Sequence, residues 1–324
     1  MNRIYKYLLK EFLPIFITLF FIISLIISLI FIISISNITA GLKIIFLDLL
    51  RMYLLSLPQI IFITLSISFF IAANSLYSRL SETQELIALF ALGFKPLKIL
   101  IPVTIIAVII VVINSFILLI SIPYSKMAFT NLKNEKKQKA KFNFKSQQIS
   151  QQFGKWSVFA STNKNEKSYA NIYLFNPEEM KFIIASSAFL KGDKGILKFT
   201  LNQGKVYEFN QSYKIIFDKM KINKKIPKVK ISIFNFKNYF QYNKKLFTKY
   251  IPFAFLPIAL LFFIPIISFF HPRLNKNHSL AYSILILTIY IAISFSNKNI
   301  ILAFVIPLIF FILGGVLYKW KVKF

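Results

Sequence analysis

The chain has 324 residues, 56% of them apolar and 38 of them phenylalanine, and its formal net charge is +29. This apolar composition excludes a soluble globular domain and indicates a protein that crosses a membrane several times. The absence of cysteine excludes disulfide bonds and thiolate metal sites. A basic excess is typical of proteins that meet nucleic acid or an anionic membrane. With this hydropathy we expect the membrane and no nucleic acid.

Three long apolar segments occupy the N-terminal part of the chain. Residues 12–35, 52–78 and 99–125 contain no charged side chain, and each is long enough to cross about 30 Å of hydrocarbon. The first is too long for the apolar core of a signal peptide and has no evident cleavage site. We therefore expect residues 1–125 to supply three transmembrane helices.

A basic segment of mixed character follows at residues 126–249. Short stretches of alternating apolar and polar residues are separated by turn-forming runs such as Asn176-Pro177 and Asn202-Gln203-Gly204. We expect an all-β domain here, either a sandwich or an open barrel, entered through a mobile basic linker at residues 133–145. The expected strands lie at residues 156–160, 170–175, 182–185, 196–201, 205–209 and 228–234.

The C-terminal part, residues 250–324, contains three further apolar segments at 250–270, 279–297 and 299–318. The predicted fold is a polytopic α-helical membrane protein with six transmembrane helices and a β domain inserted between the third and the fourth. Most lysines and arginines outside the β segment fall on one side if the N-terminus is cytoplasmic. The positive-inside rule then places both termini in the cytoplasm and the β domain outside.

The connection between the second and third spans has the pattern of a short, well-delimited helix at residues 81–93. Ser81 is a good N-cap, and Gln84 stands at the spacing of a capping box. Gly93 is placed to end the helix in a left-handed conformation, and Pro96 prevents its continuation. We expect a helix of about three turns that lies outside the membrane.

The surface of this helix has an acidic start and an apolar face. Glu82 and Glu85 lie in the first turn, where the helix dipole favours negative charge. Leu86, Leu89 and Phe90 repeat at helical spacing. Two interpretations are equally supported by the physics: the apolar face enters the groove of a soluble partner, or it lies on the membrane surface.

Catalytic chemistry is not indicated anywhere in the sequence. The two histidines, His271 and His278, lie in an expected loop without a metal-binding pattern, and no phosphate-binding Gly-rich run is present. The apolar segments contain no acidic residue, which argues against an ion-coupled carrier. We expect no catalytic residue, no metal and no cofactor in this chain, with ATP bound by a partner ATPase.

At the short helix the sequence resembles the LptF/LptG (YjgP/YjgQ) family, the permeases of the lipopolysaccharide-export ABC transporter. Six residues fall on positions of the family's coupling segment, and the run 201–204 (Leu-Asn-Gln-Gly) is similar to a pattern in its β domain. Position 90 departs from the family, because Phe90 stands where a polar group is common. The Ser-x-x-Gln-Glu-Leu form and the tail favour LptF over LptG. The six matching residues are Glu85, Leu86, Ala88, Leu89, Ala91 and Gly93.

The resemblance implies a heterodimer of LptF and LptG in the bacterial inner membrane, bound to two copies of the ATPase LptB. It implies that lipopolysaccharide leaves the membrane and passes through a periplasmic β-jellyroll to LptC and LptA. It also implies that the helix at 81–93 is the ATPase-coupling helix. The residues expected to make that contact are Glu82, Glu85, Leu86, Leu89, Phe90 and Gly93.

The same resemblance suggests how the lipid is held. Lys43, Arg51 and Lys298 lie at the expected outer boundary, where charge-assisted hydrogen bonds would hold lipid phosphate. An anchor that extends its charge to water explains any one of them better, and the three together favour phosphate more than each does alone. The expected apolar interior of the β domain is explained equally by lipid passage or by core packing. Its candidate residues are Ile172, Leu174, Ile183, Phe199, Leu201 and Val206.

Two other functions remain open at this point. One is an ABC permease for another envelope lipid or lipoprotein, which would keep the coupling helix. The other is a membrane-anchored structural or regulatory protein with a β ectodomain and no ATPase. The acidic start and glycine stop of the helix at 81–93 argue against the second.

Overall fold

The computed structural model divides the chain into two units by its internal contacts. The helical unit comprises Met1–Asn37, Leu50–Lys126 and Ile231–Phe324, and the β unit comprises Ile38–Leu49 and Met127–Lys230. The residues that the structure describes are 2–40, 45–141, 151–153, 156–165, 168–193, 196–209, 213–225, 236–271 and 277–321.

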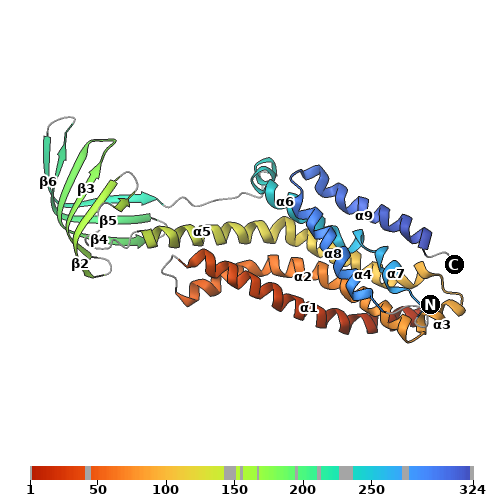
Figure 1. The fold of residues 1–324 in the computed structure, drawn as a ribbon. Helices are drawn as coiled ribbons and strands as arrows, with labels where there is room; N and C mark the ends of the chain where they lie inside the picture. The colour runs from red at the N-terminus through yellow and green to blue at the C-terminus, as the bar shows by residue number, and fades with distance from the viewer. Residues whose placement is uncertain are drawn as a thin grey trace. The chain divides into compact units, whose positions relative to one another are not determined.

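Helices account for most of the described chain (Figure 1). Five helical stretches are long and apolar enough to cross a membrane: Arg3–Thr39, Phe46–Glu82, Pro96–Lys136, Ser279–Ser296 and Ile300–Lys321. Together with the inserted sheet they confirm the predicted class, an α-helical membrane protein with a β domain. The helices are α1 (Asn2–Thr39), α2 (Phe46–Glu82), α3 (Glu85–Ala91), α4 (Pro96–Phe116), the π-helical turn η1 (Ile117–Ser121), α5 (Ile122–Lys141), α6 (Phe236–Ala259), α7 (Phe263–Ser268), α8 (Ser279–Ser296) and α9 (Ile300–Lys321).

The expected span at residues 250–270 is a broken helix. It consists of the C-terminal part of α6, a turn at 260–262 and the short α7. Proline explains the break: Pro265 lacks the N–H that would bond the carbonyl of Leu261 in the turn, and within α6 Pro257 lacks the N–H that would bond the carbonyl of Phe253. Ser66 of α2 replaces that bond, because its Oγ donates to the Phe253 carbonyl oxygen over 2.8 Å.

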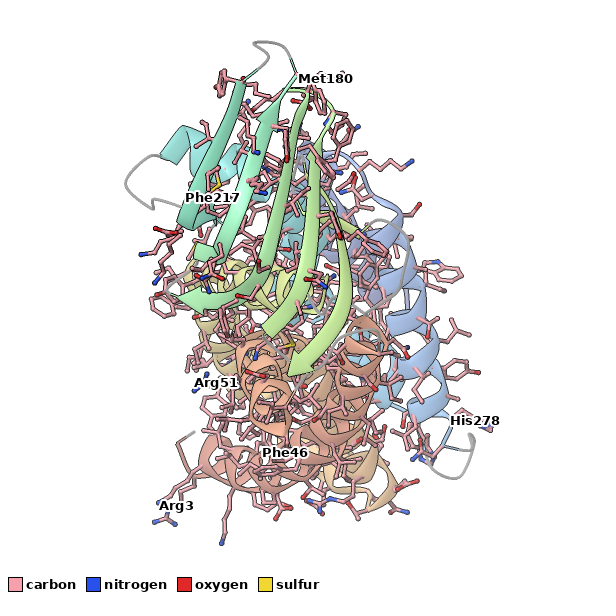
Figure 2. All side chains as sticks on the ribbon, turned by 90° about the vertical axis from the view of Figure 1, so that its left-hand side faces the viewer. Arg3, Phe46, Arg51, Met180, Phe217 and His278 are labelled. Atoms are coloured by element: carbon pink, nitrogen blue, oxygen red, sulfur yellow. The ribbon has the colours of Figure 1, made fainter. Side chains whose placement is uncertain are left out.

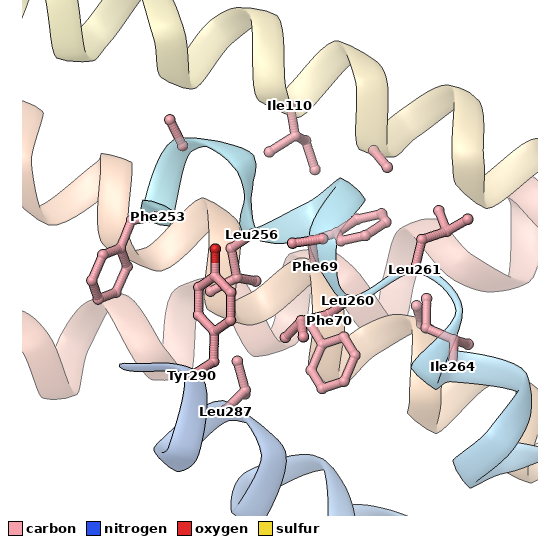
Figure 3. Packing of buried hydrophobic residues seen from close by; sticks show 14 of the residues in the cluster. Phe69, Phe70, Ile110, Phe253, Leu256, Leu260, Leu261, Ile264, Leu287 and Tyr290 are labelled. Carbon is pink, nitrogen blue, oxygen red and sulfur yellow. The ribbon is translucent and has the colours of Figure 1, made fainter. Parts of the chain in front are cut away.

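The core of the helical unit is built around this broken helix. Residue pairs in contact join α6 to α4, α8 and α9, and Figure 3 shows apolar side chains from α2, α4 and α8 around Leu256 and Leu260. In α9, Gly314 allows a close approach, because a Cβ there would lie 3.0 Å from the ring of Phe263. The labelled core side chains are Phe69, Phe70, Ile110, Phe253, Leu256, Leu260, Leu261, Ile264, Leu287 and Tyr290.

The expected mobile linker at residues 133–145 needs correction. Helical residues follow one another from Pro96 through η1 to Lys141, so the described part of that segment is helix. Lysine, glutamate and glutamine are good helix formers, so a basic composition does not predict an irregular chain. Within the β unit, Lys136 of α5 forms an ion pair with Asp48, and both side chains are largely buried.

The described strands of the β unit form one antiparallel sheet in consecutive order (Figure 1). The sheet is curved, which agrees with the open barrel better than with the sandwich. The strands are β1 (Gln151–Phe153), β2 (Trp156–Asn165), β3 (Ser168–Asn176), β4 (Lys181–Asp193), β5 (Ile196–Glu208) and β6 (Tyr213–Lys225).

The run Asn202-Gln203-Gly204, expected as a turn, is a kink inside β5 and joins two predicted strands into one. Gln203 has a φ of 48°, and a Cβ at position 204 would lie 2.4 Å from both the Ile184 carbonyl oxygen and the Phe217 ring. Phe217 stands opposite Gly204 on the outermost strand β6 (Figure 2). An aromatic ring over a strand glycine is a known means of holding such a kink.

Three further predicted strands are present in the sheet, and two observed strands had not been predicted. The segments 156–160, 170–175 and 182–185 fall within β2, β3 and β4, and the turn at Asn176 is present, with its Oδ1 accepting from the N–H of Glu178 over 3.1 Å. Strands β1 and β6 were not predicted. The expected strand at 228–234 lies outside the described residues.

The residues predicted for the interior of the β domain all lie in one buried cluster. Burial on alternate positions of β3, β4 and β5 identifies the face of the sheet that carries the core. The six predicted members are Ile172, Leu174, Ile183, Phe199, Leu201 and Val206, and the cluster also contains Val158, Ala185 and Ala188.

We predict that Gly204→Ala destabilises the protein by about 1–3 kcal/mol, the usual cost of overpacking. The Phe217 ring can move away from the new methyl group, but the backbone oxygen of Ile184 cannot. Thermal unfolding of the full chain measures the effect. Gly315→Ala is the matched control, since its Cβ would meet the nearest atom at an ordinary 3.8 Å. Equal melting temperatures for the two variants would contradict the close approach at Gly204.

Candidate docking site

The helix expected at residues 81–93 is shorter than predicted, and its N-terminal cap is different. Ser81 lies inside α2, fully buried, and its Oγ donates to the carbonyl oxygen of Ser268 over 2.7 Å. Ser268 is the last residue of α7, so its carbonyl oxygen has no N–H partner within the helix. It accepts the hydrogen bond of the Ser81 hydroxyl instead. Gln84 precedes α3 with a φ of 61° and makes no side-chain capping bond. The predicted capping box is therefore wrong.

The C-terminal stop of α3 is as predicted. Gly93 has a φ of 81°, in the left-handed region. The N–H of Phe94 donates to the carbonyl of Leu89 over 3.2 Å, and the N–H of Gly93 to that of Phe90 over 2.9 Å. This pair of bonds is the Schellman motif. Pro96 is the first residue of α4.

The apolar face predicted for partner contact packs into the chain's own core. Leu86 is 2% exposed, and the half-buried Leu89 and Phe90 pack against the same cluster. The Phe90 ring centroid lies 5.9 Å from that of Phe269. The prediction that Leu86 enters a partner's groove therefore needs correction, because this side chain anchors α3 to the helical unit.

A second apolar stripe of α3 is the exposed one. Ile87 and Ala91 stand one helical turn apart, as do Ala88 and Leu92, and all four are exposed. Leu92 is 72% exposed. The sequence shows apolar residues on two sides of this helix, and only the fold decides which side is covered. We call these four residues the exposed stripe.

Both acidic residues of the site are bound by other parts of the chain. Glu82 accepts a hydrogen bond from Asn277 Nδ2 over 2.8 Å. Glu85 accepts two, one on each carboxylate oxygen: from Tyr7 OH over 2.6 Å and from Thr83 Oγ1 over 2.9 Å. Tyr7 and Asn277 were missed by the sequence reasoning, since they are far away in the chain and no local spacing indicates them.

A cavity of about 460 Å³ lies along one flank of α3, between that helix, α7 and the C-terminal end of α9. It is lined mainly by apolar side chains, with Lys321 at its edge donating a hydrogen bond to the Ile266 carbonyl over 3.3 Å. Packing therefore leaves α3 unsupported on this flank. The lining residues from α3 are Leu86, Ile87, Phe90 and Ala91.

Of the three candidates for lipid phosphate, the structure describes two. Lys43 lies outside the described residues. Arg51 is exposed on α2, and Lys298 is exposed in the connection between α8 and α9. Within the described ranges no group of three or more histidine, cysteine or acidic side chains is placed to hold a metal ion.

The fold defines a class of protein, a multi-pass α-helical membrane protein with a β domain inserted after its third span. A family model of the lipopolysaccharide export system permease LptF/LptG matches residues 6–319. The match covers nearly the whole chain, so the chain belongs to the LptF/LptG family, as the sequence resemblance predicted. It does not separate LptF from LptG. No curated protein matches the sequence.

Membership defines the general role of the chain. It is a permease for lipopolysaccharide export and a multi-pass protein of the inner membrane. In this family the permease is a transport subunit without catalytic activity of its own.

We predict very different losses of stability for two leucines, Leu86 of α3 and Leu92 at its C-terminal end. Leu86→Ala removes a buried side chain and costs about 2–5 kcal/mol, whereas the exposed Leu92→Ala changes stability by less than about 0.5 kcal/mol. Thermal unfolding of the full chain in detergent measures both. A larger loss for Leu92→Ala than for Leu86→Ala would contradict the assignment of anchor and exposed stripe.

Proposed function

We propose that this chain is a transmembrane subunit of an ABC transporter that extracts lipopolysaccharide from the inner membrane, and that α3 docks on its cytoplasmic ATPase. The observation that supports the docking role most directly is the geometry of α3. A short helix between two spans is anchored by Leu86 and ended by Gly93, and it presents the exposed stripe outward. Such a helix offers a rigid, preorganised surface to a partner.

The proposed orientation follows the distribution of lysine and arginine. With the N-terminus in the cytoplasm, α3 and the C-terminus are cytoplasmic and the β unit is periplasmic. ATP is bound by the partner, a dimer of LptB, since the sequence has no phosphate-binding Gly-rich run. The second permease subunit is the paralogue, LptG or LptF.

The path of the lipid in this proposal runs from the membrane to the β unit. The face of the sheet that carries the apolar cluster receives the acyl chains, and β1 and β6, at the edges of the described sheet, are the sites of strand addition by LptC or LptA. Lys43, Arg51 and Lys298 hold lipid phosphate at the outer boundary by charge-assisted hydrogen bonds. Mass spectrometry of lipid that co-purifies with the complex tests the cargo, and another envelope lipid in place of lipopolysaccharide would contradict it.

We predict that Leu92→Asp abolishes the docking of the ATPase. A charge at the C-terminal end of the exposed stripe would have to lose its water in the interface, which is costly. Co-purification of the ATPase with the permease complex is the measurement, and we expect at least a ten-fold loss.

Ile216→Asp is the matched control for this experiment. Ile216 on β6 is 70% exposed, close to the 72% of Leu92, and belongs to the β unit. This variant should retain the ATPase. Normal co-purification with Leu92→Asp would contradict the proposed docking surface.

We predict that the double charge reversal Lys43→Glu and Lys298→Glu weakens photocrosslinking of lipopolysaccharide to the permease. Repulsion between carboxylate and phosphate replaces the attraction of the two ammonium groups. The conservative pair Lys43→Arg and Lys298→Arg should crosslink normally. Unchanged crosslinking in the reversed variant would remove these residues from the lipid site.

A further inference from the structure

The first membrane helix, α1, is packed unevenly along its length. Near its N-terminus Leu8 and Phe12 are fully buried in the core of the helical unit. From Leu13 to Ile33 every side chain is half-buried or exposed, and the most apolar window of this span has no buried residue at all. Packing against the main core cluster therefore holds α1 at its N-terminal end; further along, Ser28 shares a hydrogen bond with Tyr53 of α2 over 2.7 Å, and Ile35 is buried.

Two polar contacts at that same end of α1 connect it to the end of α2 and the start of α3. Glu11 forms an ion pair with Arg79, near the end of α2. Tyr7 donates its hydroxyl proton to Glu85, the first residue of α3. The O–H···O distance of 2.6 Å is that of a charge-assisted hydrogen bond, which is stronger than a neutral one.

The carboxylate of Glu85 is fixed in orientation by this arrangement. One oxygen accepts from Tyr7 of α1, and the other accepts from Thr83, in the turn that joins α2 to α3. A displacement of α3 at its N-terminal end thus acts on α1 through this hydrogen bond. Tyr7 itself is 40% exposed, so its hydroxyl is held by this bond and not by burial.

Space for such a displacement exists beside α3. The apolar cavity of about 460 Å³ on its flank separates Ile87 and Ala91 from α7. The anchors Leu86 and Phe90 also line this cavity, so a small tilt of α3 can occur without breaking the core elsewhere.

We infer that Tyr7 is a positioning residue that ties α1 to α3 through Glu85, so that a movement imposed on α3 by the ATPase is passed to α1. The inference rests on the proposed function and deepens it, because it names the first membrane helix as the receiver of the movement. It differs from a role of Glu85 in binding the ATPase directly, in which loss of the Tyr7 hydroxyl would weaken ATPase binding.

The test is Tyr7→Phe in the complete complex with its ATPase and second permease subunit. This variant removes one hydroxyl group and keeps the ring. We expect the ATPase to bind normally and to hydrolyse ATP, while lipopolysaccharide released per ATP falls roughly ten-fold, the scale of one charge-assisted hydrogen bond. Tyr282→Phe, at an exposed tyrosine of α8, is the matched control and should behave like the wild type.

A second readout separates transmission from a merely structural role. The chain has no cysteine, so spin labels can be placed on new cysteines at the exposed Phe21 of α1 and Ile301 of α9. We expect ATP to change the distance between the labels in the wild type and not in Tyr7→Phe. Combining Tyr7→Phe with Glu85→Ala should be no worse than Glu85→Ala alone.

Three results would overturn the inference. They are an unchanged ratio of lipid to ATP in Tyr7→Phe, an unchanged ATP-dependent label movement, and loss of ATPase binding, which would assign Tyr7 to docking. The proposed function has a separate failure, since it is contradicted if the wild-type chain does not bind an ATPase or if Leu92→Asp retains it.

Discussion

Backbone groups inside a membrane must find partners within the protein, and this constraint explains how the helical unit is held together. The helix α6–α7 is broken near its prolines, and two of its carbonyl groups are satisfied by serine side chains of α2. Ser66 bonds the carbonyl of Phe253, and Ser81 bonds that of Ser268. A third bond runs from the hydroxyl of Ser268 to Asn74 of α2 over 2.9 Å. These bonds fix the register of α2 against the broken helix.

The position of α3 follows from that register. Because Ser81 is held at the end of α7, α2 continues to Glu82 and the chain turns only at Thr83 and Gln84. Leu86 then enters the core, and the opposite stripe of α3 remains exposed. In the proposed function this stripe meets the ATPase. The hydrogen bond between Glu85 and Tyr7 connects the same helix to the least packed span. One short segment thereby combines an anchor, a docking surface and a connection to α1.

Local features of this site were predictable from the sequence, and features that depend on distant residues were not. Gly93 and Pro96 act on their own backbone, and both fulfil their predicted roles. Ser81 has the pattern of a cap, but its partner is 187 residues away and is visible only in the fold. The apolar face of α3 was recognised, but its direction depends on where α7 lies.

In the β unit the same distinction holds. Alternation correctly identified the buried face of β3, β4 and β5. Strand β6 was missed because Ile215, Ile216 and Phe217 are consecutive and lysines interrupt the pattern. The kink at Gly204 was taken for a turn because a run of asparagine, glutamine and glycine is typical of both, and both can contain a residue with positive φ, here Gln203.

The central claim is that the exposed stripe of α3 meets the ATPase while Leu86 stays inside the permease. Site-specific photocrosslinking in the assembled complex tests it most directly, with a photoreactive amino acid placed at Leu92 in one variant and at Leu86 in another. The account predicts a crosslink from position 92 to the ATPase and, from position 86, crosslinks only within the permease chain. A crosslink to the ATPase from position 86 and none from position 92 would contradict it.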